Sequence, residues 1–356
     1  MSPPGVTIPV TYYPHHARHD PAVVLAHGER EDAIERARRL EQVLDTLRDD
    51  GRYDFQAVEP LGFDELTRVH RSDYLEFIRR MSERARDAGT DGSDAIPYAF
   101  SRRGPVTPPK EFHPLQAGWY CADTITPIGP GAWEAARGSA AAAKRAAQFI
   151  REGHRLVYAA CRPPGHHAGR KLCGGFCYVN NAAIAADVLR TDGPVAILDI
   201  DTHHGNGTQA IFYDLPDVMF VSIHGDPAET FPFFWGYAEE TGMGAGEGAN
   251  LNLPLPPGSS AETWFDALEK ALDVIDRYQA ETLIVSLGVD VDADEPVTGG
   301  FAMRRTLLND AGKRIAREKL PTLVVQEGGY IADHLADGVR RFLEGFSDEA
   351  SRPTTV

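Results

Sequence analysis

The sequence predicts an α/β fold: a single domain with a central, mostly parallel β-sheet flanked by helices. Short runs of β-branched and other apolar residues alternate with helical stretches in the second half of the chain, at 155–161, 195–201, 218–224, 282–290 and 322–326. Such runs are typical of parallel strands covered on both faces. The 356 residues, 42% of them hydrophobic, can fill one large core. No internal repeat or linker divides them, so we predict one domain over 1–356.

Helical patterns precede and accompany the predicted strands. Residues 29–48 have helical periodicity with mixed charge, residues 64–87 form a second helical region, and an Ala-rich helix follows over 131–153. Between 88 and 116 this pattern gives way to Gly, Pro and Asp. Long loops inside compact domains tend to be functional, so we expect 88–116 to be a functional loop.

Composition narrows the classes of function. The formal net charge of −16 argues against binding nucleic acid through its phosphates and favours cationic substrates such as amines. No apolar run approaches the roughly 18 residues that span a bilayer. The N-terminal residues lack a signal pattern, so we expect a cytoplasmic protein without a membrane partner. The cysteines are too sparse for a disulfide scaffold, and we expect reduced, mostly buried thiols.

An unusual polar cluster follows each predicted strand. In chain order the clusters read PPGHHAG (163–169), DTHHGNG (201–207), HGDP (224–227), DVDADEP (290–296) and EGGY (327–330). In open α/β sheets, ligands bind beyond the carboxyl ends of the strands. The sequence therefore predicts one functional site at that edge of the sheet.

Asp201, His203 and Asp290 are the predicted metal ligands. Asp199, Asp201 and His203 alternate along one strand, so they would share a face if the extended backbone continued that far. Two carboxylates are costly to bury together unless a cation neutralises them. Capping of the following helix would explain only one of these aspartates, and a cap is the alternative for Asp290 too. Three protein ligands with an open position are typical of a catalytic zinc.

Side chains beside this predicted metal site can move protons. His166 and His167 follow the neighbouring strand and can take a proton from water and return it to a leaving amine. Asp199 and Asn206, one acidic and one neutral, are their available partners, so the two imidazoles should differ in basicity. Tyr330 can bind a carbonyl oxygen as negative charge develops there. The alternatives are two histidines on an ordinary surface loop and a packed core tyrosine.

These segments resemble the zinc-dependent histone deacetylase family of the arginase/deacetylase superfamily. The resemblance rests on CRPPGHHAGRKLCGGFCYVNNAAIAA, LDIDTHHGNGTQAIFY, VSIHGDP, SLGVD and QEGGY, between about residues 120 and 335. The stretch HGDPAETFPFFWGYAEETG is particularly similar to bacterial acetylpolyamine amidohydrolases. The resemblance implies an arginase/deacetylase fold, hydrolysis of an N-acyl amide, His167 as general base and acid, His166 paired to Asp199, and Tyr330 assisting at the carbonyl. It implies that zinc, or iron(II) in its place, is held by Asp201, His203 and Asp290.

The resemblance further implies a substrate tunnel, a second ion and a partner copy. The tunnel residues would be Gly175, Phe176 and Phe231. A structural potassium ion would be held by Asp199, Ser222 and the backbone of Asp201 and His203. The loop 88–116 would narrow the entrance and help to form a homodimer, which favours slender substrates over protein tails.

Several residues depart from the family's pattern. Asn206 stands where some members carry aspartate, which leaves one imidazole with a neutral partner. Asp294 and Glu295 replace a common Gly-Asp pair. Ile125 falls about where polyamine-selective members carry an acidic residue, while Asp123 remains as a rim acid able to hold a cationic or amide group.

We therefore predict a zinc-dependent amidohydrolase that removes an acetyl or other acyl group from a small cationic amine such as an acetylpolyamine. Deacetylation of acetyl-lysine in proteins is one alternative. A binuclear manganese ureohydrolase, with Asp292 as ligand of a second metal, is another, and a non-catalytic binder of acylated amines is the third. Among the remaining histidines, His15, His16 and His19 are expected in a solvated loop and His224 beside the site. We assign no role to four others: His70, His113, His154 and His334.

Overall fold

The computed structural model describes residues 7–90, 96–101, 107, 109–296 and 301–352. Its centre is an eight-stranded sheet in the order β4-β1-β5-β10-β9-β6-β7-β8, with each neighbouring pair parallel. The strands are β1 (Ile8–Tyr12), β4 (Tyr53–Ala57), β5 (Leu156–Ala160), β6 (Val195–Asp199), β7 (Val218–Gly225), β8 (Asn250–Leu255), β9 (Thr282–Leu287) and β10 (Thr322–Gln326). The predicted parallel sheet is confirmed, and all five predicted strands are present.

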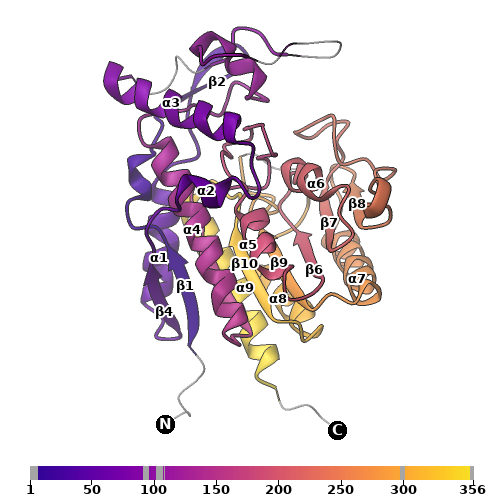
Figure 1. The fold of residues 1–356 in the computed structure, drawn as a ribbon. Coiled ribbons are helices and arrows are strands. Elements are labelled where there is room, and N and C mark those ends of the chain that lie inside the picture. Colours follow the sequence, from indigo (N-terminus) through magenta and orange to yellow (C-terminus); the bar gives the residue numbers. More distant parts are fainter. Residues whose placement is uncertain (1–6, 91–95, 102–106, 108, 297–300, 353–356) are drawn as a thin grey trace.

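Helices cover both faces of this sheet (Figure 1). Successive strand residues point to opposite sides, so Val195 and Ile197 join one apolar core while Ala196 and Leu198 join the other. The first core is closed by α2 (Phe63–Leu66), α3 (Ser72–Ala88), α4 (Ala132–Arg151), α5 (Asn181–Leu189) and α6 (Asn206–Phe212). The second is closed by α1 (Arg38–Arg48), α7 (Ala261–Tyr278), α8 (Leu308–Ala316) and α9 (Ala332–Ala350). Two buried faces explain why the strands are apolar throughout.

The helix predicted over 29–48 begins later than expected. Residues 29–32 form β3 (Glu29–Asp32), which pairs antiparallel with β2 (Val23–Ala26) in a two-stranded ribbon. The turn between them holds His27 and Gly28 at φ of 53° and 84°, which is the backbone of a tight hairpin. Mixed charge in 29–32 imitates a solvated helix because all four side chains are exposed. The helical region 64–87 is likewise two helices, α2 and α3.

Three strands of the central sheet, β1, β4 and β8, were not predicted from the sequence. β1 and β8 each contain a proline, and β4 alternates polar with apolar residues. β4 and β8 are the two edges of the sheet, where a missing N–H or a polar face is tolerated. Propensity therefore failed at β4 and β8 because edge strands do not need the continuous apolar pattern of the centre.

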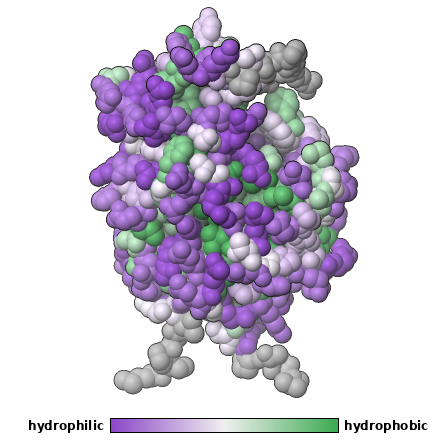
Figure 2. All heavy atoms as spheres, viewed as in Figure 1, coloured by the Kyte–Doolittle hydropathy of each residue, from purple (hydrophilic) through white to green (hydrophobic). Residues whose placement is uncertain are grey.

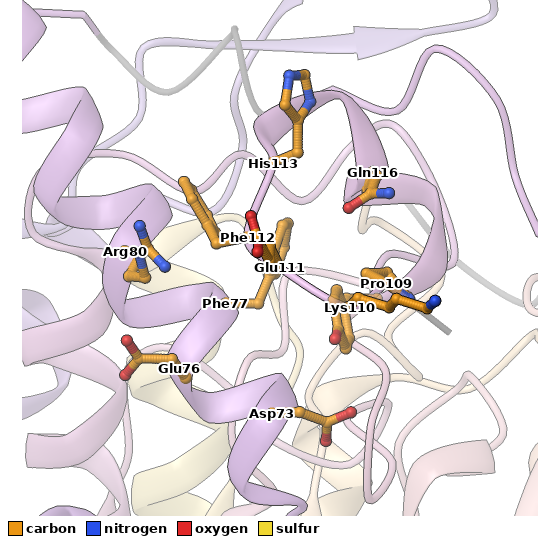
Figure 3. A pocket seen from close by; sticks show the side chains of 11 residues that line it. Asp73, Glu76, Phe77, Arg80, Pro109, Lys110, Glu111, Phe112, His113 and Gln116 are labelled. Atoms are coloured by element: carbon orange, nitrogen blue, oxygen red, sulfur yellow. The ribbon is translucent and has the colours of Figure 1, made fainter. Parts of the chain in front are cut away.

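The predicted loop 88–116 is described only in part. Residues 91–95, 102–106 and 108 lie outside the described residues, while α3 extends to Ala88 and a 3-10 helix covers Pro114–Trp119. Residues 109–113 and α3 line a pocket of about 480 Å³ that carries charges of both signs (Figure 3). The described lining includes none of the predicted site residues. The position of this loop at the entrance stays a prediction.

The N-terminal histidines differ from expectation. His16 and His19 are buried, and burial beside the Arg162 guanidinium lowers the pKa of each to about 4. The solvated-loop prediction is therefore wrong for both, because the segment packs under α4 instead of extending into solvent. All four cysteines are free and buried, as expected.

One face of the molecule is mostly polar, and the two ends of the molecule are formed by different elements. The face in Figure 2 is mainly hydrophilic, with apolar side chains in small separate groups. The two ends of the chain lie at one end of the molecule, while α3 and β2 lie at the other, toward which the arrow of β6 points (Figure 1). None of the helices in the described ranges combines the length and apolar character that a bilayer crossing requires.

Candidate active site

Three predicted metal ligands come together beyond the carboxyl ends of β6 and β9. His203 Nδ1 lies 3.2 Å from Asp201 Oδ1 and 3.1 Å from Asp290 Oδ2. One ligand atom from each residue lies within 4.8 Å of the other two, and all three side chains are buried. Two carboxylates and one imidazole in this spacing can hold a divalent metal ion.

The electrostatics of these side chains favour a cation. Burial and the adjacent Asp201 carboxylate raise the pKa of Asp290 to about 6. Two acids held this close in a buried site repel each other, and a divalent ion between them removes that cost. The residues therefore fit the metal that the sequence predicts.

The backbone around the ligands explains why glycines follow the strands. A Cβ on Gly288 would lie 2.2 Å from Asp201 Oδ2, and one on Gly328 would lie 2.3 Å from Asp290 Oδ2. The Gly328 N–H donates to Asp201 Oδ2 at 2.8 Å. Glycine at these two positions therefore makes room for the carboxylates and aligns one of them.

Asp199 does not belong to the ligand group. β6 ends at this residue, and the chain then turns, with the His203 N–H donating to Asp201 Oδ1 at 2.9 Å. The extended backbone assumed in the sequence analysis therefore stops too early to place Asp199 with Asp201 and His203. Asp199 Oδ2 instead accepts a hydrogen bond from His166 Nδ1 at 2.9 Å, the pairing implied by the resemblance.

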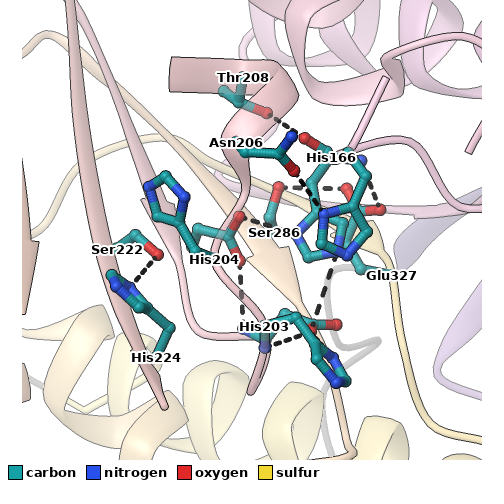
Figure 4. A network of polar contacts seen from close by, with 12 residues as sticks. His166, His203, His204, Asn206, Thr208, Ser222, His224, Ser286 and Glu327 are labelled. Atoms are coloured by element: carbon teal, nitrogen blue, oxygen red, sulfur yellow. Dashed lines mark hydrogen bonds and ion pairs between the residues drawn. The ribbon is translucent and has the colours of Figure 1, made fainter. Parts of the chain in front are cut away.

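The adjacent histidines both face the site. Their ring centroids are 4.0 Å apart, and His167 Nδ1 donates to Asn206 Oδ1 at 2.7 Å. Figure 4 shows His166 and Asn206 in one network of polar contacts with Glu327. Glu327 turns the backbone inward, because its carboxylate accepts the N–H groups of Gly165 at 2.7 Å and His166 at 3.2 Å. The alternative of two solvated loop histidines is wrong, since both side chains are buried.

The two imidazoles differ in charge state. Burial lowers the pKa of His166, but the Asp199 and Asp201 carboxylates outweigh this effect and raise it to about 10. Burial and the positive charges of His166 and His203 hold the pKa of His167 well below its usual range. His167 is therefore a neutral imidazole whose Nε2 is free to accept a proton, because its Nδ1 donates to Asn206.

Aromatic rings flank the site in pairs. Phe231 lies edge-on to His167, with ring centroids 5.0 Å apart, and Phe176 lies edge-on to Tyr330 at 5.6 Å. Gly175 keeps φ at +54°, and a Cβ there would lie 2.1 Å from His167 Cδ2. Gly175, predicted as a substrate-binding residue, therefore also gives His167 its room.

Tyr330 is held by a residue that the sequence analysis noted only as a departure. The Glu295 carboxylate accepts the N–H groups of Tyr330 at 2.7 Å and Ile331 at 3.2 Å. The Arg39 guanidinium lies 4.9 Å from the centroid of the Tyr330 ring. Burial and the nearby Asp290 carboxylate raise the pKa of Tyr330 well above 10, so its hydroxyl stays protonated and can donate.

Asp123 is engaged within the protein. Its carboxylate accepts the N–H groups of Gly175 at 2.6 Å and Ile125 at 3.0 Å. The predicted rim acid therefore orders the backbone next to His167. Ile125 packs against the apolar cluster that contains Phe176. Asp294, the other acid of the departing pair, forms an ion pair with Arg304.

Two functional residues were missed by the sequence analysis. Glu327 is fully buried at the end of β10, and Arg39 donates to the backbone oxygens of Glu327 and Gly329 at 2.6 and 2.5 Å. Glutamate directly after an apolar strand was a usable signal for the first. The sequence contains no such signal for Arg39, because a charged residue on a helix is normally expected in solvent. In the structure Arg39 is buried as an ion pair with Glu35 at 2.8 Å.

Two further groups of residues are relevant to how many metal ions the chain could bind: Asp292, and a second cluster of possible metal ligands. Asp292 is buried and lies 2.6 Å from the Arg305 guanidinium, which leaves little electrostatic attraction for a cation there. His166, Cys177 and Glu327 form a second group with donor spacing. All three members are already hydrogen-bonded: His166 to Asp199, Glu327 to backbone N–H groups, and Cys177 to the Gly175 carbonyl oxygen at 3.3 Å.

The residues of the predicted potassium site lie beside the metal ligands. Ser222 stands opposite Asp199 in the register of β6 and β7, and both are fully buried. His224 Nδ1 is 2.9 Å from Ser222 Oγ, and His224 Nε2 donates to the Gly236 carbonyl oxygen at 2.8 Å. His224 is therefore linked to Ser222 and to the following loop.

Comparisons with known proteins identify the family of this chain. Residues 33–346 match the histone deacetylase domain. The acetylpolyamine amidohydrolase of Mycoplana ramosa is 42% identical over 321 residues, which cover 89% of this chain and 93% of that protein. Acetylpolyamine amidohydrolase 2 of Pseudomonas aeruginosa is 40% identical over 335 residues, covering 93% and 95%.

A solved structure gives the same result. The crystal structure of acetylpolyamine aminohydrolase from Burkholderia pseudomallei has a TM-score of 0.90 at 36% identity, and the match covers 96% of this chain and 99% of that one. The eight-stranded parallel sheet is thus the arginase/deacetylase fold. The chain therefore belongs to the histone deacetylase family, as a hydrolase of the deacetylase and amidohydrolase type.

Proposed function

We propose that the protein is a zinc-dependent amidohydrolase that removes the acetyl group from a small N-acetylated amine. The observation that carries this proposal is the buried group of Asp201, His203 and Asp290 beside the neutral imidazole of His167. The relatives named for acetylpolyamines suggest that substrate class. The net charge of −16 would attract such cations.

Asp201, His203 and Asp290 would hold the metal. When bound, it would polarise the amide carbonyl and make water more acidic. Its two carboxylate ligands cancel its formal charge, so other side chains must contribute to catalysis.

His167 would act as general base. Its Nε2 accepts a proton from the attacking water while the new C–O bond forms at the amide carbon. The proton then passes to the amine nitrogen as the C–N bond breaks, which yields a carboxylic acid and an amine. His166, charged through its contact with Asp199, would stabilise negative charge at this stage and could donate a proton in turn.

Tyr330 would donate its hydroxyl proton in a hydrogen bond to the substrate oxygen as negative charge develops there. Such a donor typically contributes about 10²- to 10³-fold to turnover. Replacing Tyr330 with Phe is expected to lower kcat by this amount. The binding of zinc, measured on the same sample, should not change, because the hydroxyl is no part of the ligand group.

A potassium ion would lie between β6 and β7 on Asp199, Ser222 and the backbone oxygens of Asp201 and His203. We also propose a homodimer formed through the segment 88–116, whose Tyr98 and Leu115 are 93% and 70% exposed. Replacing both with Ser should yield a monomer by light scattering. A variant that keeps the dimer mass would contradict this role.

Metal content and one substrate panel test the proposal. We expect one zinc or iron(II) ion per chain, and hydrolysis of acetylputrescine and acetylspermidine faster than of acetyl-lysine peptides. Preferred hydrolysis of the peptides would favour a protein deacetylase. Two divalent ions per chain together with hydrolysis of a guanidino compound would favour the ureohydrolase, which the Asp292–Arg305 pair argues against. Binding of acetylated amines without turnover would indicate a silent binder.

A further inference from the structure

Three aromatic side chains continue outward from Phe231, which lies at the active site. The ring of Phe231 lies 5.0 Å from that of His167, and the centroids of Phe231 and Phe233 are 6.1 Å apart. Phe233 and Phe234 follow at 6.5 Å, and Phe234 and Trp235 at 6.0 Å. We call Phe233, Phe234 and Trp235 the aromatic strip.

The strip leads from the catalytic centre to solvent. Phe231 is half-buried against the histidines, whereas Phe233, Phe234 and Trp235 are 46%, 64% and 36% exposed. Most of the largest exposed apolar side chains of the described residues lie in this one stretch of chain. A contiguous exposed apolar patch at a site usually marks a binding surface.

The backbone that carries the strip is held in place by buried polar groups. The Glu240 carboxylate accepts the Gly236 N–H at 2.9 Å and the Gln209 side-chain amide at 2.6 Å. His224 Nε2 donates to the Gly236 carbonyl oxygen, and the Phe233 N–H donates to the Thr230 carbonyl oxygen at 3.1 Å. The exposed rings are therefore presented from an ordered loop.

Phe233 adds a second sign of function. Its φ is +64°, a left-handed backbone conformation that costs a bulky residue free energy. Strained backbone of this kind persists where the surrounding structure enforces it and gathers at ligand sites. The conformation turns the chain so that successive rings stay in contact with one another.

The other side chains bordering the site offer apolar surface as well. Val24, Ala33 and Phe176 form a cluster against which Ala26, Ile34, Ile125 and Tyr330 pack. The carboxylates of Asp123 and Glu295 in this region accept backbone N–H groups. An ammonium group at the entrance would therefore compete with the protein for these acids.

We propose that the aromatic strip is a subsite for the amine half of the substrate and that it takes an aromatic or apolar substituent. The substrate class is then an N-acetylated arylalkylamine or alkylamine without a second ammonium group. This inference rests on the proposed amidohydrolase function and departs from it in substrate, since it places apolar N-acetylated amines above the acetylpolyamines that the relatives and the net charge suggest. Rings bind such groups through apolar burial and edge-to-face contacts.

A matched pair of substrates tests the charge preference. N-Hexylacetamide and N-acetylcadaverine have the same chain length and differ in a terminal methyl in place of the ammonium. We expect kcat/KM to be about 3- to 10-fold higher for N-hexylacetamide, and higher still for N-(2-phenylethyl)acetamide, because each aromatic contact contributes a factor of this size. A preference for N-acetylcadaverine would overturn the proposal and indicate cation–π recognition of ammonium.

Variants locate the preference on the strip. Phe234→Ala and Trp235→Ala should each lower kcat/KM for N-(2-phenylethyl)acetamide about 3- to 10-fold. Both should leave N-acetylcadaverine within about 2-fold, since its tail makes no edge-to-face contact. Met243→Ala is the control, because Met243 is 59% exposed farther along the same loop.

The outcomes separate the two levels of inference. If the amides are hydrolysed but the strip variants match the Met243→Ala control on every substrate, the subsite is refuted while the amidohydrolase function stands. If no acetylated amine of either kind is hydrolysed by the metal-loaded protein, the proposed function fails, and the subsite fails with it.

Discussion

The floor of the active site and its entrance are built in different ways. The floor lies at the ends of β5, β6, β9 and β10, where His166, Asp201 and Asp290 are buried and hydrogen-bonded to backbone or to each other. The expected entrance is bordered by connecting segments, among them the β2–β3 ribbon, whose Val24 packs in one cluster with Phe176, and the aromatic strip with its exposed rings. Strand register fixes the chemistry, while the segments that join the strands decide what reaches it.

The difference predicts which substitutions stop catalysis and which change selectivity. Floor residues share hydrogen bonds, so a change in one displaces others. The single carboxylate of Glu327, for example, is hydrogen-bonded to Gly165, His166 and Ser286. The rings of the strip contact one another in chain order, and the three metal ligands belong to other segments, so we expect a strip residue to be replaceable without displacing those ligands.

The largest effect is expected for His167→Ala. Removing the neutral imidazole that accepts the proton should lower kcat about 10²- to 10⁴-fold, with zinc content unchanged. His154→Ala is the control, since His154 lies edge-on to Phe149 near the end of α4, away from the sheet edge that holds the site. Single-turnover rates of both variants measure the effect. Activity within a few fold of the original would exclude His167 as the base.

The second-largest effect on kcat is expected for Gly175→Ala, which adds a methyl group beside His167. Gly175→Ala would place a Cβ 2.1 Å from His167 Cδ2, so the ring must move. A displacement of the catalytic ring by about 1 Å is expected to lower kcat about 100-fold. Gly248→Ala is the matched control, because φ is +83° there and nothing lies within 4 Å of the added Cβ. Equal losses in the two variants would attribute the effect to backbone strain alone.

The same contrast explains what could be predicted from sequence. Asp201, His203 and Asp290 were found because polar residues after apolar strands converge at one edge of a parallel sheet. His166 and Asn206 followed from the neighbouring strand ends. Asp199 is the partner of His166, as predicted, but the shared strand face does not extend to His203, because β6 ends at Asp199 and strand periodicity does not encode the turn that follows.

The entrance and the outer layer were harder to predict. β3 was taken for the start of a helix, since its exposed charged residues lack strand character, and no prediction covered β2. Burial of His16, His19 and Arg39 arises from contacts between distant parts of the chain, such as the Arg162–Glu35 ion pair at 2.9 Å. Long-range pairs of this kind leave no local pattern in a sequence.

A smaller effect is expected where the floor meets the outer layer. Glu295→Ala removes the carboxylate that accepts the N–H groups of Tyr330 and Ile331, so the tyrosine loses its alignment. We expect kcat to fall about 10-fold with little change in KM, because the hydroxyl acts mainly in the transition state. Glu295→Gln keeps an oxygen acceptor and should recover most of the activity. No recovery would mean that the charge matters instead.

The smallest effect concerns stability, at a buried histidine that connects the segment before α3 to the residues around the active site. His70 Nδ1 donates to the Gly169 carbonyl oxygen at 2.9 Å, and its Nε2 accepts the Asn180 N–H at 3.0 Å. Burial, with a smaller contribution from Arg170, lowers the pKa of His70 to about 4. The unfolded chain therefore binds the proton first as pH falls, so stability is complete above about pH 6.5 and is lost toward pH 4.

His70→Gln should weaken this pH dependence. The glutamine amide does not titrate, so between about pH 7.5 and pH 5 the variant should lose about 2 kcal/mol less of its unfolding free energy than the original protein. Its stability at the higher pH will be lower, since a buried hydrogen bond is imperfectly replaced. Urea unfolding at both pH values measures the difference. If the unfolding free energies of the two proteins changed with pH in parallel, protonation of His70 would not contribute to the pH dependence of stability.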